Sequence, residues 1–366
     1  MPRPGQSRSM ERDGLSERIA VGLLLRAFPP ELVDSAISSC GRVERRSRLL
    51  PARITVYFIV TMCLFPNAGY GRVAALLNEG LASARLVYGP RQVPTTAAIS
   101  RARSRLGAAP LAALFAEAVR RSRTMPASRT RYRNWTVMTA DGTRIALPDS
   151  PGNRAQYGVS AEPLALREPL GSRAGNAALP HIHVIALAEN GTGAIRCAAF
   201  ERSQARPAGT PAQQLCRVLA QGDLLLADEG VLDCTAPVIA RTVGADLLWQ
   251  VRRSSIRQDT SGLYDGSRLC ILDGYPHKVR VIDTSAIDQR GDLAPALLAT
   301  TILDHRSAPA TELAALFQDR WSLRGALATL GPGMPQVLRS RWPEGAEQEI
   351  WGHLLVHHAI HTLLYL

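Results

Sequence analysis

The chain has 366 residues, of which 46% are hydrophobic, and its 43 basic against 31 acidic residues give a net charge of +12. This length and apolar content predict a globular protein with room for two domains, and the positive charge predicts a polyanionic partner. The six cysteines are scattered without a CxxC pair, which argues against a disulfide framework or a zinc site and favours a reducing compartment.

Neither a membrane span nor a signal peptide is visible in the sequence. The longest apolar run, Ile54 to Phe65, is too short to cross a bilayer. Residues 1–12 are polar and rich in arginine, without the apolar core of a signal peptide. We therefore expect a cytoplasmic, nucleoid-associated protein with no membrane partner.

The N-terminal third of the chain is predicted to be helical. Residues 1–13 are polar and are expected to form a disordered tail. Helical periodicity then runs through most of residues 14–125, with a break at Pro29-Pro30, and no strand pattern appears before residue 130. Residues 14–125 are therefore predicted to form an all-α domain.

One stretch of this domain has the pattern of a DNA-recognition helix. Residues 95–107 begin with a threonine that can cap a helix, carry an apolar seam, and end in a glycine. Arg101 and Arg105 share a face away from that seam, as expected of a helix-turn-helix recognition helix. The alternative is a surface helix whose arginines merely keep it soluble.

A second informative stretch is the run from Leu224 to Ala227, which ends abruptly in Asp228. A short continuous apolar run predicts a central strand that is covered on both faces. Ligands of open α/β sheets gather at the carboxyl ends of the strands, so Asp228 is placed to bind a metal or act as a base. The alternative is that Asp228 caps a helix that starts at Val231.

Asp141 ends a similar run that starts at Asn134, and Gly142 follows it. The alternative here is a hairpin turn, because Asp-Gly is among the strongest signals for one. Two strand-terminal carboxylates with hairpin and helix material between them fit a ribonuclease-H-like core, in which Asp141 and Asp228 meet at one sheet edge. Such a pair could hold two Mg²⁺ or Mn²⁺ ions about 3.5–4 Å apart, which activate a nucleophile and stabilise the leaving oxygen of a phosphodiester.

The rest of the chain predicts further strands and two late helical segments. A strand ending at Val251 is followed by Arg252 and Arg253, which would lie beside a DNA backbone. Residues 254–296 alternate in short segments and predict a β-rich insertion, after which a strand over 298–303 and a long helix over 309–330 are expected.

The C-terminal segment, residues 331–366, is predicted to be helical. His353, His357 and His361 recur on one face of it, a spacing that two zinc ligands could share. No glutamate follows His353 in an HExxH arrangement, and the apolar surroundings favour a packing helix instead.

These residues resemble the insertion-sequence-4 type transposases, DDE enzymes that move DNA by a cut-and-paste route. The likeness is carried by residues 28–33, 46–53, 141–143, 225–230, 244–249 and 336–340. It implies a ribonuclease-H-like mixed sheet over residues 126–330, with Asp141 and Asp228 as the first two acids of a metal-binding triad. It also implies DNA partners, namely terminal inverted repeats and target DNA, and a homodimer in a synaptic complex.

The third acid of that triad is missing. The last helix of the family carries Tyr, Arg, Glu and Lys at fixed spacing, and the matching positions here are Phe317, Arg320, Arg324 and Gly331. Arg320 would contact phosphate, whereas Arg324 replaces the glutamate and, as a guanidinium, cannot ligate a cation. On a regular helix, neither Asp319 nor Glu312 points in the direction of position 324.

The resemblance therefore leaves two hypotheses for this chain. It is a metal-dependent transposase, or it is a catalytically inactive DNA-binding protein derived from one, which its end at Leu366, where relatives usually continue, also favours. A third and weaker alternative is a ribonuclease-H-like nuclease unrelated to transposition.

Overall fold

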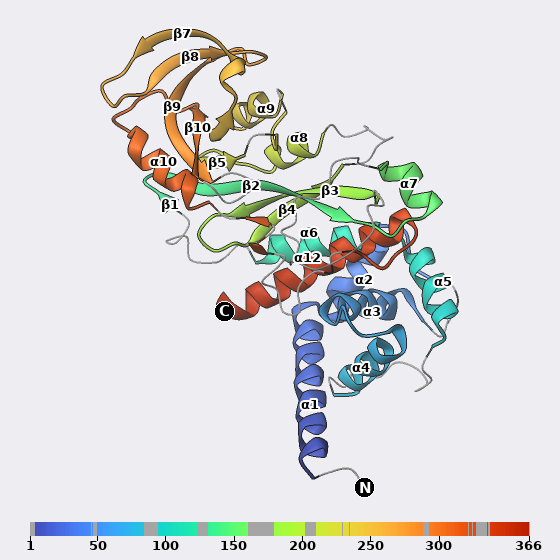
Figure 1. The fold of residues 1–366 in the computed structure, drawn as a ribbon. Helices are drawn as coiled ribbons and strands as arrows, with labels where there is room; N and C mark the ends of the chain where they lie inside the picture. Colours follow the sequence, from blue (N-terminus) through green and yellow to red (C-terminus); the bar gives the residue numbers. More distant parts are fainter. Residues whose placement is uncertain are drawn as a thin grey trace. The chain divides into compact units, whose positions relative to one another are not determined.

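A computed structural model describes the chain as two compact units (Figure 1). The described residues are 4–44, 46, 50–83, 94–122, 131–159, 179–201, 210–228, 230–233, 235–287, 293–320, 322–323, 325–326, 335 and 337–365. One unit, here called the helical unit, comprises Met1–Met125 and Leu327–Leu366. The other, the sheet unit, comprises Pro126–Ala326. The chain thus leaves the helical unit once and returns to it at its C-terminal end.

The helical unit is all-α in its described part, as the sequence predicts for residues 14–125. Its helices are α1 (Pro4–Ala27), α2 (Pro30–Ser39), α3 (Ala52–Leu64), α4 (Tyr70–Ser83), α5 (Thr96–Leu106), α6 (Ala109–Arg121) and α12 (Pro343–Tyr365). The segment 331–366, which we expected to stand apart, supplies α12 to this unit. Most of α12 is buried, and it packs against α3 and α6 because its apolar residues occur on nearly every side.

The expectation of a disordered tail over residues 1–13 is wrong for residues 4–13, which form the first turns of α1. Pro4 suits the first helical position, and each further residue added to an existing helix gains one backbone hydrogen bond. A polar composition therefore does not by itself prevent a helix from forming. Neither α1 nor any other described helix combines the length and apolarity of a membrane span.

The sheet unit is built on one mixed sheet. Its strands are β1 (Arg131–Tyr132), β2 (Trp135–Ala146), β3 (His181–Glu189), β4 (Ile195–Phe200), β5 (Asp223–Ala227), β6 (Asp246–Val251), β7 (Ile256–Gly262), β8 (Arg268–Leu272), β9 (Lys278–Ile287) and β10 (Leu293–Thr300). The order across the sheet is β4-β3-β2-β5-β6-β10-β9-β8-β7, with β1 paired to β2. Strands β2, β3 and β4 run antiparallel, whereas β2, β5 and β6 run parallel. This is the ribonuclease-H-like arrangement that the sequence predicts.

Helices cover both faces of the central strands. The helices of this unit are α7 (Pro151–Tyr157), α8 (Pro211–Cys216), α9 (Ala236–Thr242) and α10 (Ala310–Gln318), with a short 3₁₀ turn at Arg253–Ser255. Leu225 faces a core shared with α8 and α9, while Leu224 and Leu226 face a core shared with α10. Burial on both faces explains the unbroken apolar run of β5, since successive side chains of a strand point to opposite faces.

The β-rich insertion is present, but it extends the main sheet. Strand β10 pairs antiparallel with β6 on one side and with β9 on the other, so β7 to β10 continue the sheet beyond its core. The strand expected over 298–303 begins earlier, at Leu293, and ends at Thr300. Pairing with β9 supplies backbone hydrogen bonds from Leu293 onward, so residues 293–296 remain extended before β6 joins the pairing at Leu297.

Candidate functional site

Asp141 lies inside a strand and not at the end of one. Strand β2 runs through Asp141 and Gly142 without a turn, with Asp141 opposite Ala186 of β3. Both the hairpin turn and the strand-end placement are therefore wrong. A Cβ atom on Gly142 would come within 2.8 Å of His183 Nε2, so the glycine permits close approach of a side chain from β3.

Asp228 directly follows the last residue of β5, as predicted, but it does not cap a helix. The next helix, α9, begins at Ala236, several residues beyond the predicted start at Val231. Asp233 supplies the acceptor at the start of α9 instead. Its Oδ1 accepts from the amides of Thr235 at 2.9 Å and Ala236 at 2.8 Å. The carboxylate of Asp228 is therefore available for tertiary contacts.

The structure brings Asp141 and Asp228 to the same edge of the sheet. Strands β2 and β5 are parallel, and their register ends at the pair Ala140 and Ala227, immediately before the two aspartates. Burial raises the pKa of Asp141, and the nearby charge of Asp228 raises it further. The register of two parallel strands therefore places the carboxylates side by side.

Protein hydrogen-bond donors orient Asp141 and oppose the effect of burial on its pKa. Its Oδ1 accepts from its neighbour, the amide of Gly142, at 2.8 Å, and its Oδ2 accepts from the amide of Leu323 at 2.7 Å. The Ser322 side chain is a further hydrogen-bond partner, and all three bonds lower the pKa that burial raises. Asp141 is thus oriented by backbone groups from two separate segments.

Arg320 forms an ion pair with Asp228. Its Nη2 donates to Asp228 Oδ1 at 2.5 Å, and its Nη1 donates to the carbonyl of Phe317 at 3.0 Å. The guanidinium also lies over the Phe317 ring, 4.3 Å from its centroid. Arg320, predicted to contact phosphate, is in this structure the cationic partner of a carboxylate.

The long helix predicted over 309–330 is interrupted at this site. Helix α10 ends at Gln318, and Asp319 takes the C-cap position. A continuous helix would pair the amide of Leu323 with the carbonyl of Asp319, but that amide donates to Asp141 and that carbonyl accepts from Asn190 at 3.3 Å. Tertiary hydrogen bonds replace the helical ones here, so the angles of one continuous helix do not carry across Asp319.

The two carboxylates fit one hard divalent cation, since paired carboxylate oxygens are the ligands that Mg²⁺ and Mn²⁺ prefer. In the described part of the chain, no three His, Cys, Asp or Glu residues gather closely enough to hold a metal. Glu312 is engaged elsewhere, because it accepts from Tyr132 at 2.7 Å and from Arg133 at 2.9 Å. Arg324 lies outside the described residues, and its guanidinium supplies no ligand. Among the described residues, a second ion therefore lacks a carboxylate ligand.

Arg252 and Arg253 follow the end of β6. Because β6 runs parallel to β5, these arginines leave the sheet at the edge that carries Asp228. The side chain of Arg253 is 80% exposed and lies 3.8 Å from a carboxylate oxygen of Asp283. An exposed guanidinium with so distant a partner can turn to an incoming phosphate at little cost.

In the helical unit, α5 forms as its sequence predicts. Thr95 caps its start by accepting from the amide of Ala98 at 3.2 Å, and Gly107 ends it with a positive φ of 73°. Arg101 and Arg105 are both exposed. The helix therefore begins, ends and exposes its predicted arginines as expected.

Arg105 borders a cavity of roughly 320 Å³. Arg42 and Arg46 line the same cavity, and Arg42 donates to the carbonyl of Arg105 at 3.3 Å. Arg105 itself lies 3.3 Å from Glu44. Three arginines from two distant segments thus surround one hollow of the helical unit.

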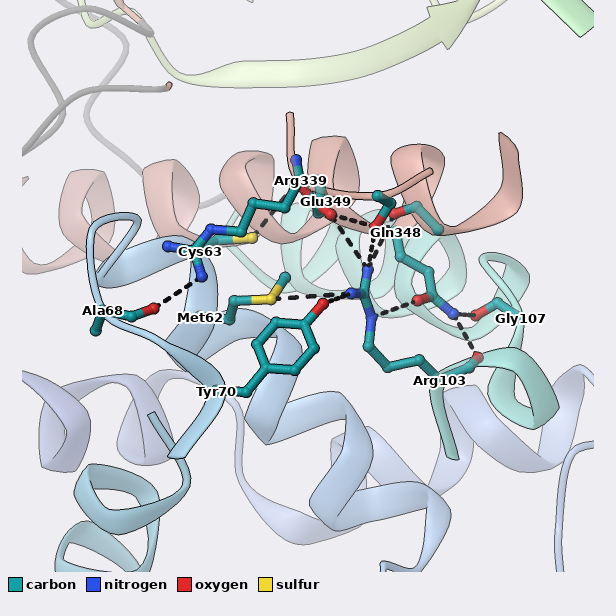
Figure 2. A network of polar contacts seen from close by, with 11 residues as sticks. Met62, Cys63, Ala68, Tyr70, Arg103, Gly107, Arg339, Gln348 and Glu349 are labelled. Atoms are coloured by element: carbon teal, nitrogen blue, oxygen red, sulfur yellow. Dashed lines mark hydrogen bonds and ion pairs between the residues drawn. The ribbon is translucent and has the colours of Figure 1, made fainter. Parts of the chain in front are cut away.

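Sequence reasoning missed Arg103, whose side chain is fully buried between α5 and α12 (Figure 2). It donates to Gln348 at 3.1 Å, to Tyr70 at 2.6 Å and to Ser340 at 2.9 Å, and it lies 3.4 Å from Glu349. The sequence spacing did indicate that Arg103 would be buried. Position 103 falls four residues after the seam residue at position 99 and therefore lies on the same, buried face of the helix.

Comparisons by sequence and by structure find similar proteins among the transposases. Residues 18–116 match the family described as insertion element 4 transposase N-terminal. Transposase InsG for insertion sequence element IS4 of Escherichia coli is 25% identical over 353 residues, covering 90% of this chain and 74% of the relative. A solved piggyBac transposase synaptic complex with hairpin DNA aligns over 94% of this chain and 74% of that chain, with a TM-score of 0.45 and 11% identity. The first two matches thus support an insertion element 4 family transposase, because the N-terminal residues match that family's N-terminal model and most of the chain is similar to the InsG transposase.

Proposed function

We propose that this chain binds the ends of a mobile element and carries out metal-dependent cleavage and transfer of DNA strands. The observation that supports this best is the pair of carboxylates, Asp141 and Asp228, at one edge of a ribonuclease-H-like sheet. The alignment with the transposase named above covers 90% of this chain and spans both residues. DNA with terminal inverted repeats is the proposed substrate, and a homodimer that pairs two ends is the proposed working form.

Each residue at the sheet edge has a proposed part in this reaction. Asp141 and Asp228 would hold Mg²⁺ or Mn²⁺, which when bound polarises a phosphodiester oxygen and lowers the pKa of an attacking water or 3′-hydroxyl. The amides of Gly142 and Leu323 keep Asp141 oriented for that purpose. Arg252 and Arg253 would neutralise the DNA backbone along the same edge.

DNA binding is proposed for the helical unit as well. Arg101 and Arg105 are exposed on α5, and Arg42 and Arg46 join Arg105 around the cavity described above. Arginine side chains present planar donors that match phosphate oxygens in pairs. We assign this face to contacts with the DNA backbone, which hold the element end in register.

Strand cleavage in the presence of Mn²⁺, on duplex DNA that carries the element's own ends, tests the proposal. We expect cleavage by the unaltered chain and its loss to background in Asp228→Asn, because one carboxylate cannot hold the ion. Asp273→Asn is the matched control, since Asp273 is 62% exposed and its contact is a surface one with Arg257 at 3.6 Å. Equal activity in Asp228→Asn and Asp273→Asn would rule out the assigned site.

A second candidate function is DNA binding without chemistry. The observation in its favour is Arg324 at the position of the third acid, together with the absence of a third carboxylate among the described residues at this edge. The Arg324→Glu variant separates the two candidates. If the unaltered chain binds the element ends without cleaving them and only Arg324→Glu cleaves, the chain is a DNA-binding protein. Cleavage of any duplex, without preference for inverted repeats, would instead indicate an unrelated nuclease.

A further inference from the structure

Arg320 holds the position at which a cation would meet Asp228. Its guanidinium is within 2.5 Å of Asp228 Oδ1, and the side chain is only 16% exposed. A divalent ion shared by Asp141 and Asp228 would lie beside this guanidinium and be repelled by it. The ion pair therefore competes directly with metal binding at the same carboxylate.

Arg320 is anchored in a way that lets its guanidinium pair either with Asp228 or with another anion. The guanidinium lies over the ring of Phe317 and donates to the carbonyl of the same residue, so it is held at the end of α10 independently of Asp228. Its remaining donors can meet a pair of oxygens of a carboxylate or of a phosphate equally well. A DNA phosphate arriving at this edge can therefore take Arg320 from Asp228 while the contacts with Phe317 persist.

We propose that Arg320 couples cation binding to DNA binding by exchanging Asp228 for a DNA phosphate. This inference rests on the proposed function, because it assumes that the cation binds between Asp141 and Asp228. Without DNA, the guanidinium offsets the negative charge of the pair and keeps cation affinity low. With DNA, the phosphate takes the guanidinium and Asp228 becomes free to hold the ion. The site is then loaded when its substrate is present.

Such coupling is reciprocal, so the cation must strengthen DNA binding by the same factor by which DNA strengthens cation binding. The other donors at the site do not produce this behaviour. The amides of Gly142 and Leu323 contact Asp141, but they are uncharged. They therefore do not change the net charge around the two carboxylates when DNA binds. Arg320 is thus a positioning residue, and its role would be measured in both the affinity for the cation and the affinity for DNA.

Calorimetric titration of Ca²⁺ into the full chain, with and without saturating duplex DNA carrying the element's ends, tests the coupling. Ca²⁺ prefers oxygen ligands, and Asp228→Asn with the same DNA provides the background. In the unaltered chain we expect DNA to tighten Ca²⁺ binding by about 5–150-fold, the usual range for coupled sites. In Arg320→Gln, Ca²⁺ should already bind tightly without DNA, and DNA should change its affinity less than about twofold.

The control variant is Arg257→Gln, an exposed arginine of β7 whose contact is a surface one with Asp273 at 3.6 Å, which should retain the full coupling. Arg320→Lys keeps the charge and should retain part of it. Equal effects of DNA on the unaltered chain and on Arg320→Gln would overturn the inference while leaving the metal site intact. If no variant binds Ca²⁺ above the Asp228→Asn background, the proposed metal site fails, and the function with it.

Discussion

At the scale of single residues, charge alone does not decide where an arginine lies. Arg101, Arg103 and Arg105 alternate along α5, yet Arg103 is fully buried while the other two are exposed. The buried guanidinium is neutralised by Glu349 and also lies over the Trp342 ring, 4.8 Å from its centroid. Burial of a charge is tolerated here because the network supplies both a counter-charge and hydrogen-bond acceptors.

Replacing Arg103 with methionine should therefore destabilise the helical unit strongly. The change leaves Glu349 buried without its cationic partner, which typically costs about 3–5 kcal/mol. Arg101→Met, on the exposed face of the same helix, should stay within about 0.5 kcal/mol. Urea unfolding followed by hydrogen exchange in α5 and α12 measures both, and similar losses in the two variants would contradict the buried network. Adding Glu349→Leu to Arg103→Met should recover part of the stability.

At the scale of elements, close approach of two helices depends on a residue without a side chain. Gly352 of α12 lies against α3, where an added Cβ atom would meet Cys63 Sγ at 2.5 Å and Ile59 at 3.3 Å. Cys63 also donates from its thiol to the carbonyl of Glu349 at 3.4 Å. The glycine thus costs helix propensity and in return permits tight packing of α3 on α12.

Gly352→Ala should destabilise the helical unit although alanine favours helices. Overpacking a dense core costs about 1–3 kcal/mol, against a gain of about 1 kcal/mol in helix propensity. Gly22→Ala in α1 is the control, because a Cβ atom there meets nothing within 4 Å, and it should be neutral or stabilising. Thermal unfolding compares the two. Adding Cys63→Ala to Gly352→Ala should cost less than the sum of the single changes, and simple additivity would argue against the contact.

At the scale of the whole molecule, residues from both ends of the chain form the helical unit. Its C-terminal helix carries the two buried histidines, His353 and His357. Burial lowers the pKa of both to about 4, with a smaller contribution from Arg339 at His353 and from His361 and His358 at His357. Neutral, buried imidazoles agree with a packing helix.

These histidines should make the helical unit sensitive to acid. Because the folded pKa of about 4 lies below the ordinary 6.5, the unfolded chain binds protons first as the pH falls. Stability should be full above pH 6.5 and be lost progressively down to pH 4, by about 3 kcal/mol per histidine at one unit per 1.36 kcal/mol. Urea unfolding across this range, with hydrogen exchange resolving the two units, measures the loss. A variant with both histidines changed to glutamine should flatten the dependence in the helical unit, and an unchanged slope would refute this origin.

Local signals in the sequence were sufficient where a structure is stabilised by neighbouring residues. The cap of α5 at Thr95, its end at Gly107 and the buried strand before Asp228 all formed as predicted, because capping bonds and strand burial act over a few residues. The ribonuclease-H-like mixed sheet also agreed with the prediction. The family resemblance then agreed with the pairing of distant strands that the two strand-terminal carboxylates had suggested.

The sequence by itself thus determined the helices, the central strands and the meeting of Asp141 with Asp228, since these follow from short-range pattern and strand order. Only the tertiary structure decided that Asp141 lies mid-strand, that α10 ends early, and that Arg320 pairs with Asp228. It also decided that α12 completes the helical unit. The physical reason is common to all of these, because a backbone amide or a buried charge takes whichever partner the fold brings near, and sequence spacing does not specify that partner.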